Sequence, residues 1–210
     1  MNNSLENNAV PLRTRLKQLR SELSPIDSHR GALLIRGRLF TWLATTRARL
    51  LAANRPAPKH IAAFWSTDQE PELQPLLRQW VEEEGFTVSL PVVAAVDAPL
   101  EFRVWTPDTD MLIGAYGIAE PQGEVAPLPD LVLVPTLGYT RAGDRIGYGK
   151  GYYDRTLAAL KAQRHFYTSI GIAWSCGDLS NQTYAPAAHD VRLDSVLTDK
   201  GWAVAAPVLL

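Results

Sequence analysis

The sequence predicts an α/β fold: a single-domain layered sandwich with a largely parallel central sheet flanked by helices. Short apolar runs bounded by turn residues alternate with segments of helical spacing, which is the order expected of parallel strands joined by helices. The length of 210 residues is enough to bury the core of one domain. The composition, 46% hydrophobic and 20% charged, is that of a globular protein and excludes the disordered class.

The first quarter of the chain is predicted to be helical. Leucines recur at helical spacing, with basic residues between them, in "PLRTRLKQLRSEL" at 11–23. Ser24 and Pro25 are typical of an N-cap and a first helical position, so we expect a second helix running through residues 33–53. This N-terminal helical segment, about 11–53, is expected to pack on the α/β core of one domain spanning 1–210.

The rest of the chain alternates between predicted strands and helices. Strands are predicted at "HIAAFWS" (60–66), "FTVSLPVV" (86–93), "LEFRVW" (100–105), "DLVLVP" (130–135), "YTSIGIAW" (167–174) and "RLDSVLT" (192–198). Helices are predicted at "ELQPLLRQWVEEEG" (72–85) and "YYDRTLAALKAQ" (152–163). The segment "YGIAEPQGE" (116–124) predicts an irregular loop.

Charge and cysteine content limit the partners and the compartment. The net charge of −1 gives no global field to attract nucleic acid, so anion binding must depend on local Lys and Arg side chains. No stretch approaches the roughly 20 apolar residues of a membrane span, and the N-terminal residues lack the apolar core of a signal peptide. The lone Cys176 is typical of a reducing compartment. We expect a cytoplasmic protein that binds small molecules, without nucleic acid, membrane or an obligate protein partner.

The segment "RIGYGKGYYDR", Arg145–Arg155, predicts a phosphate cradle after the strand at 130–135. Three alternating glycines allow positive φ angles and close approach of a ligand to the backbone N–H groups, and the next helix adds its positive end. Lys150, Arg145 and Arg141 are candidate countercharges. The spacing excludes a Walker A loop and the dinucleotide fingerprint. The alternative is a flexible surface turn with solvated charges.

Other candidate residues have two interpretations. Asp154, at the start of the predicted helix, either favours the helix N-terminus electrostatically or holds Mg²⁺. Trp65 lies inside an apolar run and suits core packing as well as stacking against a flat ligand. His189 beside Asp190 is more typical of a surface or capping group than of a metal pair.

Longer stretches carry a family resemblance. "LVLVPTLGYTRAGDRIGYGKGYYDRTLA" (131–158) resembles the signature of the 5-formyltetrahydrofolate cyclo-ligase family, also called methenyltetrahydrofolate synthetase. "LRTRLKQLRSELSP" resembles its N-terminal basic helix, "AFWSTDQEPEL" its folate-contacting strand and loop, and "HDVRLDSVLT" its C-terminal strand with a metal-site aspartate. The resemblance implies a fold related to ribose-phosphate isomerase and CoA-transferase domains.

The resemblance also implies a reaction and its cofactors. With ATP as co-substrate and Mg²⁺, 5-formyltetrahydrofolate becomes 5,10-methenyltetrahydrofolate, and ADP and phosphate are released. Phosphorylation of the formyl oxygen precedes ring closure.

Site residues follow from the same matches. The implied ATP-binding residues are Arg13, Arg145, Ile146, Gly147, Tyr148, Gly149, Lys150, Gly151, Tyr152 and Tyr153. The implied folate-binding residues are Arg13, Trp65, Glu70, Tyr148, Gly149, Lys150, Gly151 and Tyr152. Magnesium is assigned to Asp154 and Asp190, and the chemical step to Lys150, Arg145 and Tyr152.

Three positions depart from the family pattern. Ala9 stands where a lysine is often found, with Arg15 or Lys17 as candidates to replace its phosphate contact. Thr136 replaces a glycine after the strand proline, and Thr140 replaces an aspartate.

Two other functions stay open at this point. A catalytically silent nucleotide- or folate-binding regulator is favoured by Ala9. A sugar-phosphate enzyme of the same fold is also compatible with the architecture, because fold does not fix function. Glu70 and the stacking aromatic residues count against the sugar-phosphate enzyme.

Overall fold

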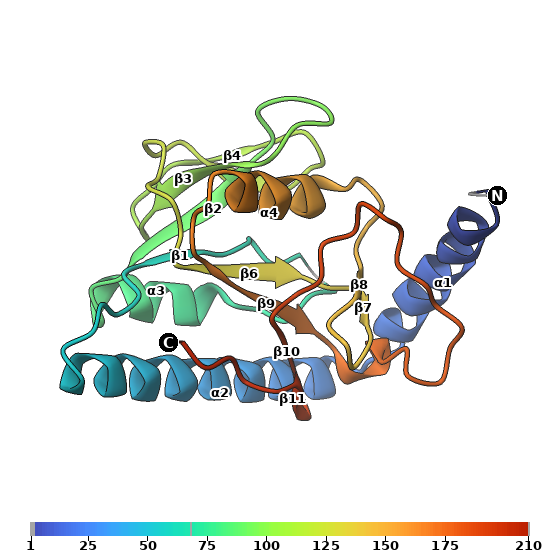
Figure 1. Cartoon of the computed structure of the whole chain (residues 1–210), viewed down its shortest axis with the longest axis horizontal. Helices are drawn as coiled ribbons and strands as arrows, with labels where there is room; N and C mark the ends of the chain where they lie inside the picture. The colour runs from blue at the N-terminus through green and yellow to red at the C-terminus, as the bar shows by residue number, and fades with distance from the viewer. Residues whose placement is uncertain (1–2, 68, 210) are drawn as a thin grey trace.

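The computed structural model describes residues 3–67 and 69–209, with residues 3–10 described by their backbone alone. The described helices are α1 (Asn3–Ser21), α2 (Pro25–Ala52), α3 (Gln74–Glu82) and α4 (Tyr152–Ala162), with a 3-10 turn η1 (Ser175–Gly177). The described strands are β1 (His60–Ala62), β2 (Thr87–Val92), β3 (Glu101–Trp105), β4 (Met111–Ile113), β5 (Ala119–Pro121), β6 (Leu131–Pro135), β7 (Gly138–Tyr139), β8 (Arg145–Ile146), β9 (Thr168–Ala173), β10 (Ser195–Thr198) and β11 (Gly201–Val204). Helices cover both faces of the central sheet (Figure 1).

The central sheet has seven strands in the order β11-β10-β9-β6-β1-β2-β3. Its inner strands, from β10 to β2, pair in parallel, while β3 and β11 pair antiparallel at the two edges. The predicted layered α/β fold with a largely parallel sheet is therefore confirmed.

β1 and β6 are parallel neighbours, but the chain adds the next strand on opposite sides of this pair. From β1 the chain continues through α3 to β2 on one side, whereas from β6 it continues through α4 to β9 on the other. The carboxyl ends of β1 and β6 therefore flank a topological switch point, which is the usual place for a ligand in an open α/β sheet.

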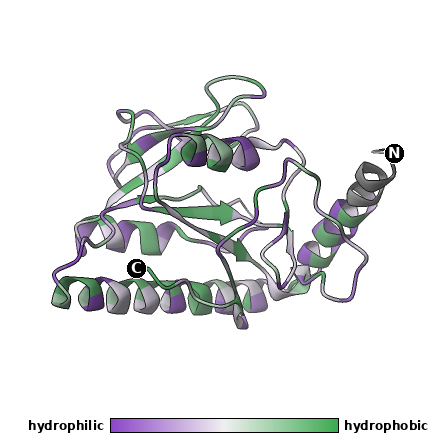
Figure 2. Ribbon diagram, in the orientation of Figure 1, coloured by the Kyte–Doolittle hydropathy of each residue, from purple (hydrophilic) through white to green (hydrophobic). Residues whose placement is uncertain are grey.

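Alternating side chains of the strands build a core on each face of the sheet. On β6, Leu131 and Leu133 pack with residues of α2 and α3, whereas Val132 and Val134 pack with Leu157 of α4. Figure 1 shows α2 and α3 on one side of the sheet and α4 on the other. In Figure 2 the central strands are hydrophobic, while polar and apolar residues alternate along α2. This is the pattern expected for buried strands between amphipathic helices.

The N-terminal helices begin and pack through the predicted signals. The Ser24 hydroxyl accepts a hydrogen bond from the backbone N–H of Asp27, and Pro25 follows at the first helical position of α2. Helix α1 begins at Asn3, well before the predicted start, and continues through Pro11. Its leucine stripe joins a small third cluster, made up of Leu12, Leu16, Leu19, Leu137, Ile146, Leu179 and Tyr184. Helix α1 is thereby seated against the β7–β8 hairpin.

Several short strands were not predicted. The segment 116–124, predicted as an irregular loop, contains β5, which pairs antiparallel with β4. Strands of two to four residues are too short to show a clear alternation in sequence, so β4, β5, β7, β8 and β11 escape prediction. Among the described residues, no helix is both long and apolar enough to cross a membrane.

Candidate functional site

A cavity of about 400 Å³ opens at the carboxyl ends of β1 and β6. The segment after β1 contributes Phe64 and Trp65, and Pro135 marks the end of β6. All but one of the site residues implied by the family resemblance line it: Arg13, Trp65, Glu70, Arg145, Gly147, Tyr148, Gly149, Lys150, Gly151, Tyr152, Tyr153, Asp154 and Asp190. The exception is Ile146, whose side chain is buried in the cluster beneath α1. The fold thus brings together residues from α1, the loop after β1, the glycine-rich loop and the C-terminal segment.

The glycines of the glycine-rich loop allow positive φ angles and leave the N-terminus of α4 without a side-chain cap. Gly149 and Gly151 have φ angles of +93° and +65°, a region that other residues adopt only with strain. Gly151 is also the N-cap of α4 and supplies no side-chain cap, so the first turn of α4 keeps free N–H donors at the edge of the cavity. Arg13 Nε donates to the carbonyl of Gly147 at 3.1 Å, which ties α1 to this loop. These donors are suited to an anion.

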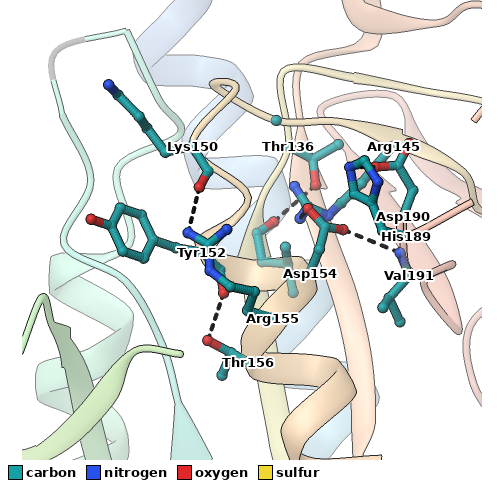
Figure 3. A network of polar contacts seen from close by, with 12 residues as sticks. Thr136, Arg145, Lys150, Tyr152, Asp154, Arg155, Thr156, His189, Asp190 and Val191 are labelled. Carbon is teal, nitrogen blue, oxygen red and sulfur yellow. Dashed lines mark hydrogen bonds and ion pairs between the residues drawn. The ribbon is translucent and has the colours of Figure 1, made fainter. Parts of the chain in front are cut away.

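Arg145 and Asp154 form a buried ion pair below the loop (Figure 3). Arg145 Nη2 lies 2.8 Å from Asp154 Oδ2, and the two side chains are only 5% and 14% exposed. The other carboxylate oxygen of Asp154 accepts the backbone N–H of Val191 at 3.1 Å. The guanidinium also lies over the ring of Tyr153, with Cζ 5.9 Å from the ring centroid. Two residues predicted to act separately, one on phosphate and one on metal, are therefore paired with each other.

Asp190 lies at the same end of the cavity. Its Oδ2 accepts the backbone N–H of Ala187 at 2.8 Å and the hydroxyl of Tyr184 at 3.3 Å, and its Oδ1 lies 3.8 Å from His189 Nε2. Burial and the neighbouring carboxylate of Asp190 raise the pKa of Tyr184, which stays a hydrogen-bond donor. His189 itself is mostly exposed, as expected of a surface group.

The two carboxylates of Asp154 and Asp190 suit Mg²⁺. The described residues contain no cluster of three or more typical metal-ligating side chains. Magnesium commonly takes one or two protein carboxylates and completes its shell with water and substrate phosphates. Two hard oxygen donors beside an anion cradle meet that requirement.

Aromatic side chains form the outer wall of the cavity. Tyr116, in the turn of the β4–β5 hairpin, lies edge-on to Tyr152 with ring centroids 5.9 Å apart, and their hydroxyls are 3.0 Å apart. The Lys150 ammonium lies 5.5 Å from the centroid of the Tyr116 ring. Deeper in, Trp65 makes an edge contact with Trp105 at 6.0 Å. Trp65 therefore both packs on the core and faces the cavity.

A polar chain crosses the cavity wall at Tyr148. Arg20 Nη1 donates to the Tyr148 hydroxyl at 2.8 Å, and this hydroxyl donates to Glu70 Oε1 at 2.7 Å. Arg20 also donates to the carbonyl oxygen of Thr136, at the end of β6. The chain links α1, the glycine-rich loop and the segment after β1.

Comparison with known proteins decides the family. A family model described as the 5-formyltetrahydrofolate cyclo-ligase family matches residues 6–199. The chain belongs to this family. Cyclo-ligases named 5-formyltetrahydrofolate cyclo-ligase include that of Haemophilus influenzae, 30% identical over 89% of this chain and 95% of that protein. The protein of the same name from Mycolicibacterium smegmatis is 30% identical over 92% of this chain and 95% of its own length.

Solved structures agree with the fold of this cyclo-ligase family member. The NMR structure of Aquifex aeolicus 5,10-methenyltetrahydrofolate synthetase covers 92% of this chain and 91% of its own, with a TM-score of 0.69 and 24% identity. A 5,10-methenyltetrahydrofolate synthetase from Mycoplasma pneumoniae gives a TM-score of 0.66 at 23% identity, over 91% of this chain and 98% of its own. The family and its named relatives indicate 5-formyltetrahydrofolate cyclo-ligase activity.

The departures from the cyclo-ligase pattern are accommodated locally. The Thr136 hydroxyl donates to the carbonyl of Val134 at 3.0 Å. The Thr140 hydroxyl accepts the backbone N–H groups of Ala142 and Asp144, both at 3.2 Å, and so holds the β7–β8 turn as a short polar side chain should. The side chain of Ala9 lies outside the described residues.

Sequence reasoning missed lining residues of the β4–β5 hairpin and the buried Arg20 behind Tyr148, and it misplaced Arg141. Tyr116, Ile118 and Glu120 line the cavity from the unpredicted β4–β5 hairpin, and nothing in their spacing marks them. Arg20 carried a usable signal, because it lies seven residues after Arg13 and thus on the same face of the predicted helix. Arg141, a candidate countercharge, does not line the cavity and pairs with Asp178 at 2.7 Å.

Proposed function

We propose that this protein uses ATP and Mg²⁺ to convert 5-formyltetrahydrofolate into 5,10-methenyltetrahydrofolate, with release of ADP and phosphate. One observation carries the proposal. In a chain of this family, the glycine-rich loop, two carboxylates and an aromatic wall all line one cavity at the switch point of the sheet. An anion cradle beside flat apolar surfaces suits a nucleotide and a pterin held side by side.

The chemistry requires activation of an amide-like carbonyl. The formyl oxygen is a poor leaving group, so the γ-phosphoryl group is transferred to it, the bond to the β-phosphate oxygen breaks, and ADP leaves. The neighbouring folate nitrogen then attacks the formyl carbon and closes the five-membered ring. The C–O bond breaks, and the oxygen departs with the phosphate. No protein nucleophile is needed, so the protein acts by positioning and by stabilising charge.

Residues of the loop are suited to the phosphoryl transfer step. Negative charge on the transferring group is met by the Lys150 ammonium, by loop N–H groups and by the positive end of α4. Arg145 is oriented by its ion pair with Asp154. Asp154 and Asp190 would hold Mg²⁺, which supplies charge neutralisation on the phosphates when bound.

The folate side of the site is assigned to aromatic and acidic residues. Trp65 and Tyr152 offer flat surfaces for the pterin, and Glu70 offers a carboxylate for its N–H groups. Glu70 Oε2 is itself fixed by the backbone N–H and the hydroxyl of Thr67, each at 3.0 Å. A fixed carboxylate gives directional recognition of a polar heterocycle.

The reaction is tested by the near-ultraviolet absorbance of methenyltetrahydrofolate after mixing protein, 5-formyltetrahydrofolate, ATP and Mg²⁺. We expect a rise only when all four are present. A flat trace from folded protein that still binds ATP would reject the proposal and favour the silent regulator.

Replacing Lys150 with Ala tests the cradle within the same assay. Loss of a charge-assisted contact of about 1.5–3 kcal/mol should weaken ATP use by roughly 10- to 150-fold. Lys161→Ala, in the last turn of α4, the helix that follows the loop, is the matched control and should leave ATP use unchanged. Equal behaviour of the two variants would remove Lys150 from the proposed cradle.

A further inference from the structure

Tyr148 separates two cavities. On one side lies the main cavity of about 400 Å³. On the other lies a second cavity of about 250 Å³, lined by Lys17, Arg20, Thr67, Gln69, Leu137 and Tyr148. With open space on both sides and 41% of the residue exposed, packing alone does not fix the orientation of the tyrosine ring.

Polar contacts fix Tyr148 instead. The hydroxyl accepts a hydrogen bond from Arg20 at 2.8 Å and donates one to Glu70 at 2.7 Å. The Lys17 ammonium lies 5.8 Å from the ring centroid. Burial and the carboxylate of Glu70 raise the pKa of Tyr148, so the hydroxyl keeps its proton and remains the donor to Glu70. The direction of the two hydrogen bonds is thus determined, because a guanidinium can only donate.

Arg20 is itself rigidly held. Its residue is 4% exposed, and its second Nη donates to the carbonyl of Thr136 at the end of a central strand. Leu16, one helical turn before Arg20, and Leu19, the residue before it, are packed in the cluster beneath α1. A buried guanidinium whose two Nη atoms both donate hydrogen bonds is a fixed reference point for the Tyr148 side chain.

We propose that Arg20 is a positioning residue for the folate substrate, acting through the Tyr148 hydroxyl on the carboxylate of Glu70. The inference rests on the proposed function, which assigns Glu70 to the folate. Arg20 holds Tyr148 across the gap between the cavities, and Tyr148 holds one oxygen of Glu70 while Thr67 holds the other. The relay acts mainly on formylfolate affinity, whereas ATP affinity depends mainly on Lys150 and the backbone N–H groups of the loop.

A double-mutant cycle tests the relay. Calorimetry measures binding of 5-formyltetrahydrofolate and, separately, of ATP to the whole protein and to Arg20→Met, Tyr148→Phe and the double variant. Each single variant should weaken formylfolate binding by about tenfold, because each breaks a hydrogen bond to a charged group. The double variant should bind formylfolate as tightly as the single variant with the lower affinity, because both changes break the same chain of hydrogen bonds from Arg20 to Glu70. ATP affinity should fall less than formylfolate affinity in all three, because Lys150 and the backbone N–H groups of the loop stay in place.

Control variants distinguish a positioning role of Arg20 from a general loss of folding or of ligand binding. Arg30→Met, an exposed arginine of α2, is the matched substitution and should leave both affinities unchanged. Arg20→Lys keeps the charge and one donor and should restore part of the lost formylfolate affinity. If Arg20→Met does not fold, Tyr148→Phe and Arg20→Lys still test the relay, because Tyr148→Phe removes a single oxygen and leaves Arg20 in place.

Each outcome bears on a distinct claim. Additive losses in the double variant, or an ATP affinity that falls as far as the formylfolate affinity, would overturn the role of Arg20 while leaving the proposed reaction intact. Tight formylfolate binding without any methenyltetrahydrofolate product would overturn the proposed reaction, and the cycle would still decide the relay. No formylfolate binding by the unaltered protein would overturn both.

Discussion

Where α4 meets the glycine-rich loop, the cavity wall consists of buried, paired charges, whereas along the β4–β5 hairpin it consists of exposed aromatic side chains. Arg145 is 5% exposed in its side chain and bound to Asp154, but Tyr116 is 51% exposed and bound to Tyr152 at the surface. Buried charges in fixed positions require no reorganisation when an anion arrives. Exposed rings on a two-stranded hairpin have few contacts that oppose their movement. The charged wall is therefore organised before substrate binds, while the aromatic wall is suited to adjust to it.

Breaking the charged wall should have the largest effect. Arg145→Met leaves the carboxylate of Asp154 buried without its partner, so the free energy of unfolding should fall by about 3 kcal/mol or more. Urea denaturation followed by circular dichroism measures the change, and cyclo-ligase activity should be lost with it.

The exposed Arg141–Asp178 pair gives a matched control for this prediction. It has a similar distance, 2.7 Å, but the Arg141 side chain is 62% exposed. Arg141→Met should therefore cost less than about 1 kcal/mol. Equal losses in the two variants would show that burial does not distinguish the two ion pairs.

Changes to the aromatic wall should alter substrate use without altering stability. Tyr116→Ala removes an exposed ring, so the free energy of unfolding should change by less than about 0.5 kcal/mol. Loss of one aromatic contact of about 1 kcal/mol should raise the KM for formylfolate roughly fivefold. Steady-state kinetics measure this change, with Leu112→Ala in the same hairpin as the control. An unchanged KM would remove Tyr116 from the substrate contact surface.

A smaller effect, on the pH dependence of stability, is expected from His60 at the amino end of β1. This residue belongs to neither the charged nor the aromatic wall of the cavity. His60 is 4% exposed, with Nε2 2.8 Å from the Ser89 hydroxyl, and burial lowers the pKa of its imidazole. Between the lowered pKa and the ordinary value of about 6.5, the unfolded chain binds the proton more strongly than the folded one. Stability should therefore fall as the pH drops below about 6.5, by at most about 1.4 kcal/mol per pH unit from this group.

Urea midpoints at about pH 7.5 and about pH 5.5 check the sign of this effect. His60→Gln lacks the titrating group and should lose less stability on acidification than the unaltered protein. An identical loss in both proteins would assign the acid sensitivity to other groups.

Much of the fold was predictable because its signals are local. The apolar run at 130–135 is a central strand, Ser24 caps α2, and the glycine-rich segment lies between that strand and α4, as predicted. The β4–β5 hairpin was missed because its strands are short and because Leu112 and Ile113 face solvent, so that burial left no pattern in the sequence.

The contacts between the site residues were less predictable than the residues themselves. Family resemblance identified Arg145, Asp154 and Glu70, and the cavity contains all three. The pairing of Arg145 with Asp154 and of Tyr148 with Glu70 depends on how separate segments are placed in space. Spacing along the chain carries no information about that placement. For Arg20, spacing indicated only the helix face that it shares with Arg13, and not its contact with Tyr148.

The hydrogen bond from Arg20 to Tyr148 joins residues 128 positions apart, which affects how the protein is made. At about 5–20 residues per second, translation produces α1 roughly 6–25 s before the glycine-rich loop exists. Throughout that interval, the leucines of α1 lack the loop-side partners Leu137 and Ile146, so the nascent helix carries an uncovered apolar stripe. Docking of α1 must therefore follow synthesis of the loop, and the contacts of Arg13 and Arg20 with the cavity wall form only then.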